Sequence, residues 1–167
     1  MSSALDTLSA GEAALVREAD APRGSAAMKA VLTDRRFSDP DWVYERKLDG
    51  IRCVAIRDGA SVTLLSRNDL SLNERYPELA GALEKESCTR FAVDGEVVAF
   101  DGAQTSFAAL ARRGQKPVKV FLYVFDLLWL EGHDVRPLPL LGRKRLLRAA
   151  LARHDGVRLT PHRRGDG

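Results

Sequence analysis

The sequence predicts an α+β domain in which largely antiparallel sheets are flanked by helices. The chain has 167 residues and 45% of them are apolar, which is enough for one domain with a hydrophobic core. Short runs of alternating apolar and polar residues are separated by turn signals such as Asp58-Gly59, a pattern typical of hairpins. The helical patterns do not alternate regularly with the strands, as they would in parallel βαβ units, so antiparallel pairing is favoured.

The first third of the chain changes from a small-residue leader to strands. Residues 1–27 are rich in Ala and Ser, and we expect them to form a mobile leader with a short helix at residues 11–20. The cluster Asp39-Pro40-Asp41 then marks a turn. It is followed by three predicted strands, at Trp42–Leu48, Arg52–Arg57 and Val62–Ser66.

The remaining residues carry further helical and strand patterns. Helices are predicted at Arg75–Glu86, Ser106–Arg113 and Arg143–His154. Strands are predicted at Phe91–Val93, Val97–Phe100 and Val118–Leu128. The first of these helices opens near Asn73, a suitable N-cap, and the last strand is long enough to lie centrally in a sheet. In the last helix the arginines form the outer face, which is either solvated or follows a phosphate backbone.

Charge and cysteine content indicate the compartment. The net charge of +3 is mildly basic and compatible with a polyanionic partner. Cys53 and Cys88 are the only cysteines, and no Cys/His cluster has the spacing of a zinc site, so we expect reduced thiols in a cytoplasmic protein. The first residues do not resemble a signal peptide, and no apolar run approaches the roughly 20 residues that span a bilayer.

The most informative run is Glu45-Arg46-Lys47-Leu48-Asp49-Gly50-Ile51-Arg52. A neutral lysine amine can attack phosphorus, and a neighbouring cation such as Arg52 favours the neutral form. Gly50 has no Cβ, so the backbone there can approach a phosphate closely. The run therefore predicts that Lys47 attacks the α-phosphate of a nucleotide and that the site holds the AMP. The alternative is that Asp49-Gly50 is a hairpin turn beside a surface lysine.

Further polar and aromatic side chains stand beside predicted strands. Asp94-Gly95-Glu96 places carboxylates between two apolar strands, which suits a ribose hydroxyl or a metal, unless the second carboxylate lies on the wet face of a hairpin. Ser66-Arg67-Asn68 offers a guanidinium fork to a phosphate, or simply a solvated arginine. Phe121, Tyr123 and Phe125 alternate along one strand face, which is more typical of a core than of a base-stacking platform.

In this order and at these separations, the motifs resemble the nucleotidyltransferase (adenylation) domain of ATP-dependent DNA ligases, in particular the bacterial ligase D type used in end joining. Lys47-Leu48-Asp49-Gly50-Ile51-Arg52 matches the family's KxDGxR motif. The later matches are Ser66-Arg67-Asn68, Asp94-Gly95-Glu96, Tyr123-Val124-Phe125-Asp126-Leu127-Leu128, Thr105-Ser106-Phe107-Ala108-Ala109-Leu110 and Arg143-Lys144-Arg145-Leu146-Leu147. The resemblance covers residues 28–167 and implies the DNA ligase/mRNA capping enzyme nucleotidyltransferase fold, which is ATP-grasp-like, in incomplete form.

The resemblance implies a role for each matched residue. Lys47 would attack the α-phosphate of ATP, expel pyrophosphate and carry AMP as a lysyl-AMP phosphoramidate. For the base, the resemblance implies that Glu45 contacts the adenine amino group and that Phe125 stacks on adenine. It implies that Arg52 binds ribose and phosphate and that Glu96 binds the ribose 2′-hydroxyl or a metal. Arg67 would bind the 5′-phosphate of a nick. The implied cofactors are ATP and Mg²⁺ (or Mn²⁺), and the implied partners are nicked or broken double-stranded DNA and end-joining repair proteins, in the cytoplasm at the nucleoid.

The resemblance also implies that residues 28–167 are the N-terminal part of the adenylation domain. Two later motifs, one supplying an acidic residue to a metal and one supplying lysines to the phosphates, are expected to lie outside the chain, as is the C-terminal OB-fold domain. Their loss is expected to abolish ligation and to expose an edge at Val118–Leu128. The alternatives are an RNA ligase or capping-type nucleotidyltransferase, which ATP or GTP preference would separate, and an inactive nucleotide- or DNA-binding remnant.

Overall fold

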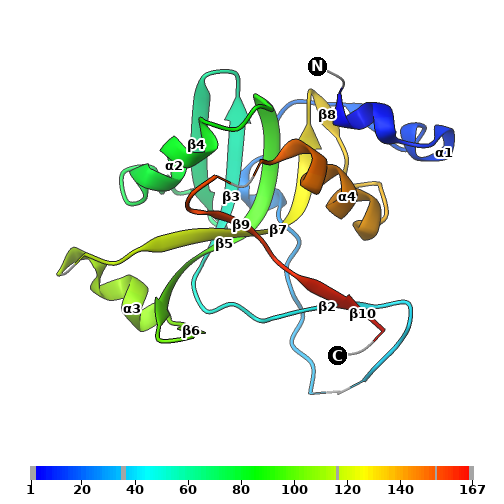
Figure 1. The fold of residues 1–167 in the computed structure, drawn as a ribbon. Coiled ribbons are helices and arrows are strands. Elements are labelled where there is room, and N and C mark those ends of the chain that lie inside the picture. The colour runs from blue at the N-terminus through cyan, green and yellow to red at the C-terminus, as the bar shows by residue number, and fades with distance from the viewer. Residues whose placement is uncertain (1–2, 35–36, 116, 153, 166–167) are drawn as a thin grey trace.

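The computed structural model describes residues 3–34, 37–115, 117–152 and 154–165. Its main body is a curved, mostly antiparallel sheet with helices beside it, and a small two-stranded sheet lies apart from it (Figure 1). The strands are β1 (Arg17–Glu18), β2 (Val43–Glu45), β3 (Ile51–Asp58), β4 (Ser61–Ser66), β5 (Arg90–Asp101), β6 (Gln104–Thr105), β7 (Val120–Leu130), β8 (His133–Asp134), β9 (Val157–Leu159) and β10 (His162–Arg164). The helices are α1 (Ala10–Ala13), α2 (Pro77–Leu83), α3 (Phe107–Ala111) and α4 (Leu140–Ala150), with 3₁₀ turns at Ala4–Thr7, Gly24–Ala26 and Arg112–Gly114.

The sheet order confirms the predicted α+β class with antiparallel pairing. The main path runs β1-β8-β7-β5-β3-β4, with β9 added in parallel to β7 and β6 paired with β5, while β10 and β2 form the separate sheet. The hairpin predicted at Asp58-Gly59 is confirmed, since Asp58 pairs with Ser61 and Gly59 has a φ of 64°. Among the described residues, no helix combines the length and the apolarity needed to cross a bilayer.

The predicted break at Gly95 is wrong. The two strands expected on either side of this glycine form one continuous strand, β5, whose pairing with β7 shifts register between Asp94 and Gly95. A Cβ at Gly95 would lie 2.6 Å from the carbonyl oxygen of Tyr123, so the glycine allows two backbones to come close together. The signal that suggested a turn therefore marks an irregularity inside a strand.

The strand expected at Val118–Leu128 is central, as predicted, and the expectation that it would expose an edge is wrong. It corresponds to β7, which pairs with β5 along one side and with β8 and β9 along the other. Leu122, Val124 and Leu127 are fully buried in the main core, which also holds residues of α2 and α4. Long apolar strands of this kind are typically buried by neighbours on both sides.

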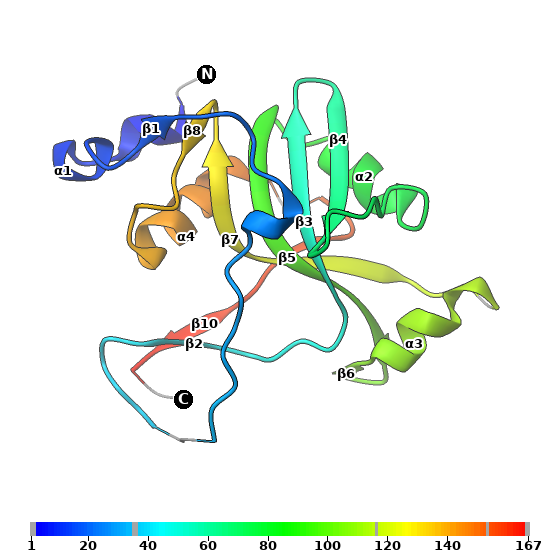
Figure 2. The ribbon, with the colours of Figure 1, turned by 180° about the vertical axis from the view of Figure 1, so that it is seen from behind.

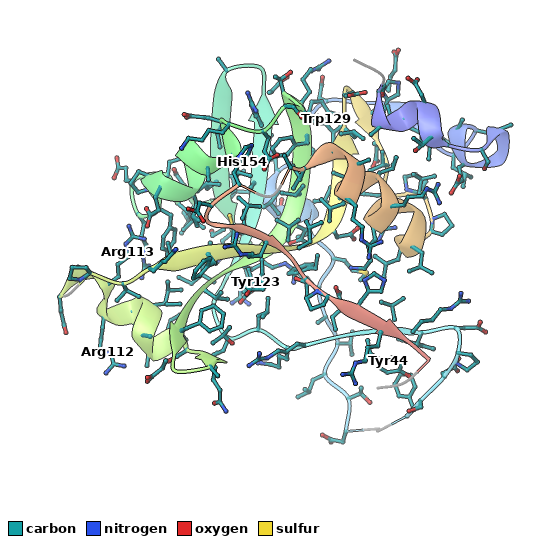
Figure 3. All side chains as sticks on the ribbon, viewed as in Figure 1. Tyr44, Arg112, Arg113, Tyr123, Trp129 and His154 are labelled. Atoms are coloured by element: carbon teal, nitrogen blue, oxygen red, sulfur yellow. The ribbon has the colours of Figure 1, made fainter. Side chains whose placement is uncertain are left out.

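A second, smaller core lies on the opposite face of the sheet. It consists of Val54, Ala92, Leu128 and Trp129, with Ala21 and Ala27 of the N-terminal segment packed against them. Figure 2 shows this segment crossing the face of the sheet turned away from α2 and α4. The indole N–H of Trp129, labelled in Figure 3, donates to the carbonyl oxygen of Ala19 at 2.6 Å. The N-terminal segment thus covers part of this face of the sheet.

The N-terminal segment differs from the expected mobile leader with a helix at residues 11–20. In the described part, residues 3–27, the helix is confined to Ala10–Ala13 and is followed by β1, which adds to the main sheet through β8. Glu12 also forms an ion pair with Arg145 of α4, at 2.8 Å. These contacts depend on groups more than 100 residues away, which local sequence patterns do not reveal.

Candidate active site

Lys47 lies on the exposed connection between β2 and β3. The alternative of a hairpin turn at Asp49-Gly50 is not supported, because β2 pairs with β10 whereas β3 pairs with β4 and β5. Instead, Asp49 ties the connection to the start of α3. Its backbone N–H donates to Thr105 Oγ1, and its carboxylate accepts from the backbone N–H of Phe107, both at 3.0 Å. The position of Lys47 is therefore held by a short side-chain bridge to another part of the chain.

Gly50 lets this connection enter the sheet. A Cβ at Gly50 would lie 2.1 Å from the carbonyl oxygen of Val97 and 2.9 Å from a methyl carbon of Val98, so no other residue fits without movement. The backbone N–H of Gly50 is also one of the groups that lower the pKa of Glu96. The glycine thus permits close approach of the connection between β2 and β3 to β5, the strand that carries Glu96.

Arg52 and Asp94 form a bidentate ion pair on adjacent strands. Arg52 Nε and Nη2 donate to the two carboxylate oxygens of Asp94 at 2.5 and 2.6 Å, and Asp94 is 2% exposed. Burial raises the pKa of Asp94, and the hydrogen bonds and charge of Arg52 oppose this rise. The arginine fork therefore favours the ionised carboxylate in a poorly solvated place, while its own direction is fixed.

Glu96 stands opposite Arg52 on β5 and is half-buried. Burial raises the pKa of Glu96, whereas the charges of Arg52 and Lys47 and the N–H of Gly50 lower it. Lys47 lies in the connection that leads into β3, the strand that carries Arg52, and Glu96 faces Arg52 on β5. A lysine, an arginine and a carboxylate thus lie around the entry of β3.

Phe125 lies on the same open face. The guanidinium carbon of Arg52 is 4.7 Å from the centre of its ring, a cation–π contact. Phe121 and Tyr123 are half-buried on this side, whereas Leu122 and Val124 point into the core. The sequence analysis favoured a core position for the alternating aromatic residues of this strand, and that prediction is wrong. Figure 3 shows Tyr123 on the part of β7 that crosses the middle of the molecule, far from Trp129 at the other end of the same strand.

Glu45 forms an ion pair with Lys144, a residue for which the sequence analysis predicted no role in the site. The ammonium of Lys144 donates to Glu45 Oε1 at 2.8 Å and to the carbonyl oxygen of Phe125 at 2.7 Å. Lys144 is 4% exposed, and the sequence analysis predicted no separate role for it. Its spacing from Leu147 and Leu151 puts it on the apolar stripe, and that signal could have identified it.

Arg143, its neighbour, was also missed. It makes a bidentate ion pair with Asp126, at 2.7 and 2.8 Å, in which each side chain is 14% exposed. Asp126 lies opposite Asp94 in the register of β7 and β5, so two neighbouring carboxylates are each held by their own arginine. This arrangement reduces the repulsion between like charges at the back of the site.

Arg67 follows β4 in an exposed loop and faces the same hollow as Arg52. The two arginines line a cavity of about 550 Å³, and the other lining residues are Gly24, Ser25, Ala27, Met28, Lys29, Ala30 and Asn68. The N-terminal segment forms one wall, since Arg52 donates to the carbonyl oxygen of Met28 at 3.1 Å. A cavity with three cationic side chains suits a polyanion such as a phosphate chain.

The described residues contain no group of three or more His, Cys, Asp or Glu side chains arranged to hold a metal ion. Glu96 is a half-buried carboxylate at the entry of β3, and Asp94 is already bonded to Arg52. A single carboxylate fits the way in which Mg²⁺ is usually held in nucleotide sites, where substrate phosphates and water supply most ligands. The donor set is thus compatible with a metal that arrives with a nucleotide.

Comparison with known proteins identifies the family. Residues 25–166 match the family model described as ATP dependent DNA ligase domain. The chain is 34% identical over 145 residues to a bifunctional non-homologous end joining protein LigD of Bacillus subtilis, covering 75% of this chain and 23% of the relative. It is 38% identical over 122 residues to the multifunctional LigD of Pseudomonas aeruginosa, covering 69% of this chain and 14% of the relative. The chain belongs to the ATP-dependent DNA ligase domain family.

The structural comparison agrees with this assignment. A mycobacterial DNA ligase D complexed with ATP and MES matches with a TM-score of 0.61 and 27% identity, covering 75% of this chain and 41% of that one. The predicted nucleotidyltransferase fold is thereby confirmed for the part that the chain contains. The chain spans less than a quarter of the curated relatives named above.

Proposed function

We propose that this chain performs the adenylation chemistry of an ATP-dependent DNA ligase of the end-joining type, with Lys47 as the nucleophile. The observation that carries the proposal is the grouping of Lys47, Glu96 and Arg52 around the entry of β3, beside a cationic cavity, in a chain of this family. A nucleophile, a polar group for the ribose and cations for phosphate are the components that the first step requires.

In the proposed first step, Lys47 Nζ gives up a proton and attacks the α-phosphorus of ATP. A nitrogen–phosphorus bond forms, the bond to the bridging oxygen breaks, and pyrophosphate leaves with the electron pair. The AMP then passes to the 5′-phosphate of a DNA break, and an attacking 3′-hydroxyl displaces it. In such reactions the protein mainly positions groups and offsets charge. The ion pair with Asp94 directs Arg52, and Glu96 faces Arg52 from the neighbouring strand.

The same geometry supports the proposed nucleotide contacts. Phe125 would stack on adenine and Glu45 would accept a hydrogen bond from its amino group, since Lys144 joins these two residues. Arg52 would bind ribose and phosphate, and Glu96 the ribose 2′-hydroxyl or the metal. Arg67 would bind the 5′-phosphate of DNA, because it shares the cationic cavity with Arg52. A bound Mg²⁺ or Mn²⁺ would offset phosphate charge, held by nucleotide oxygens and Glu96.

The proposed substrate is nicked or broken double-stranded DNA, with end-joining repair proteins as partners in the cytoplasm at the nucleoid. Support comes from the names of the relatives, which describe end-joining proteins. The basic cavity at Arg67 supports a phosphate backbone as ligand.

Intact-mass spectrometry after incubation with ATP and Mg²⁺ tests the proposal. We expect a mass gain of one AMP in the wild-type chain, none in Lys47→Ala, and the full gain in Lys85→Ala, which changes an exposed lysine next to the end of α2. A gain with GTP instead of ATP would favour a capping-type enzyme. No gain in a chain that melts cooperatively would reject adenylation by this chain and favour a nucleotide- or DNA-binding remnant.

A further inference from the structure

Lys144 is a buried cation whose partners come from two different sheets. It lies on α4 with 4% of its surface exposed, and its ammonium bonds Glu45 on β2 and the Phe125 carbonyl on β7. Glu45 and Lys144 are 99 residues apart in sequence. Burying a charge costs free energy unless the charge is paired and hydrogen-bonded. The Glu45 carboxylate pairs with the ammonium of Lys144, and the Phe125 carbonyl accepts a second hydrogen bond from it.

The two partners of Lys144 are the residues expected on either side of the nucleotide base. The bond to Glu45 uses Oε1, and among the described residues no donor to Oε2 is found. The Glu45 side chain remains 25% exposed, so the second oxygen can reach a ligand. Lys144 thereby fixes both the direction of a carboxylate and its separation from the strand that carries the aromatic ring.

We infer that Lys144 is a positioning residue that determines base specificity, an inference that rests on the proposed function. A carboxylate fixed in this way accepts a hydrogen bond from the amino group of adenine. Guanine presents a carbonyl oxygen at the same position, which a fixed carboxylate repels. A free glutamate could rotate away and tolerate either base. Rigid, directed hydrogen bonding is what allows a site to reject the wrong polar group.

A purely structural role for Lys144 would have a different consequence. If the ammonium only joined α4 to the two sheets, its removal would weaken the fold and the binding of all nucleotides alike. If it positions Glu45, its removal changes the ratio of affinities for ATP and GTP, which a general loss of stability does not alter. The ratio therefore separates the two roles.

The experiment measures the Kd values of ATP and GTP by calorimetric titration of the full chain, for the wild type, Lys144→Met, Lys144→Gln and a control, Arg148→Gln. Arg148 lies four residues further along α4 and is exposed. We expect the wild type to prefer ATP and both Lys144 variants to lose at least about tenfold of that preference, the size of one lost hydrogen bond to a charged group. The control should keep the wild-type ratio.

A second arm removes the amino group from the ligand. Purine riboside triphosphate should bind the wild type about tenfold more weakly than ATP, and this difference should vanish in Lys144→Met. Should Lys144→Met not fold, Lys144→Gln answers the same question, because it removes the charge that holds Glu45 while its amide keeps a donor for the buried carbonyl oxygen of Phe125. A folded Lys144 variant with an unchanged ATP/GTP ratio overturns the inference alone. A wild-type chain that binds neither nucleotide overturns the proposed function, and the inference with it.

Discussion

Alanine at position 50 would place a methyl group in space that β5 already occupies. The added Cβ would lie 2.1 Å from the carbonyl oxygen of Val97, a backbone atom that cannot rotate away. Real Cβ contacts are almost never shorter than 3.0 Å, so the loop or the strand must move by about 1 Å. Gly50 is not among the glycines with positive φ, so the whole effect is steric.

The expected cost is that of overpacking a closely packed site, about 2 kcal/mol. For a domain of this size, that loss lowers the melting temperature by roughly 4–8 °C. The same displacement moves Lys47 relative to Glu96, because Gly50 packs against Val97 and Val98, which follow Glu96 on β5. Misplacement by about 1 Å typically reduces the rate of a positioned reaction about 10²-fold.

Thermal unfolding and the rate of AMP transfer to Lys47 are the assays for Gly50→Ala. The matched control is Gly81→Ala, because a Cβ there meets nothing within 4 Å and lies in α2. Alanine is the better helix former, so the control should melt at the wild-type temperature or slightly above it. If Gly50→Ala matched the wild type in both melting and rate, the reasoning from close approach would be refuted.

Three further predictions concern other contacts. Arg52→Lys replaces the guanidinium that bonds both oxygens of buried Asp94, at 2.5 and 2.6 Å, by a single amine. We expect the free energy of unfolding in urea to fall by about 1–3 kcal/mol. An unchanged unfolding midpoint would contradict this prediction. A hydrogen bond from Arg145 lowers the pKa of Glu12 from 4.5 to about 2, so this contact stabilises docking of the N-terminal segment above pH 4.5 and is lost as the pH falls toward 2. Amide exchange of residues 3–18 should accelerate over that window, and Glu12→Gln should remove the dependence. Trp129→Phe removes the 2.6 Å hydrogen bond from the indole to the N-terminal segment, which contributes about 1 kcal/mol. Trypsin should therefore cleave that segment faster than in the wild type. Equal rates of cleavage would contradict the proposed contact.

Local patterns were sufficient for the class of fold and for the family. Alternating apolar residues predicted the strands that became β3, β4 and β7, because side-chain alternation is a property of the strand itself. The order of the short motifs around Lys47, Arg67 and Glu96 indicated the family, which the family model confirmed. These features depend on near neighbours in the chain, so they can be read without knowledge of the fold.

The predicted ends of helices and strands were wrong where one residue type is compatible with two backbone roles. Gly95 suggested a turn, yet it permits close backbone packing within β5. Asn73 suggested a helix N-cap, yet its side chain bonds the backbone of Leu64 and Val62, and α2 begins only at Pro77. Glycine and asparagine serve several backbone roles, and the packing around them decides between these roles.

The sequence by itself determined the family, the strand-rich architecture and the nucleophile motif. Only the tertiary structure decided that the N-terminal segment covers one face of the sheet, that Arg143 holds Asp126 and that Lys144 joins Glu45 to Phe125. Each of these contacts links residues that are distant in sequence, and each buries a group that would be solvated on an isolated helix or strand. Their existence depends on where whole elements meet, and that is set by the packing of the complete core.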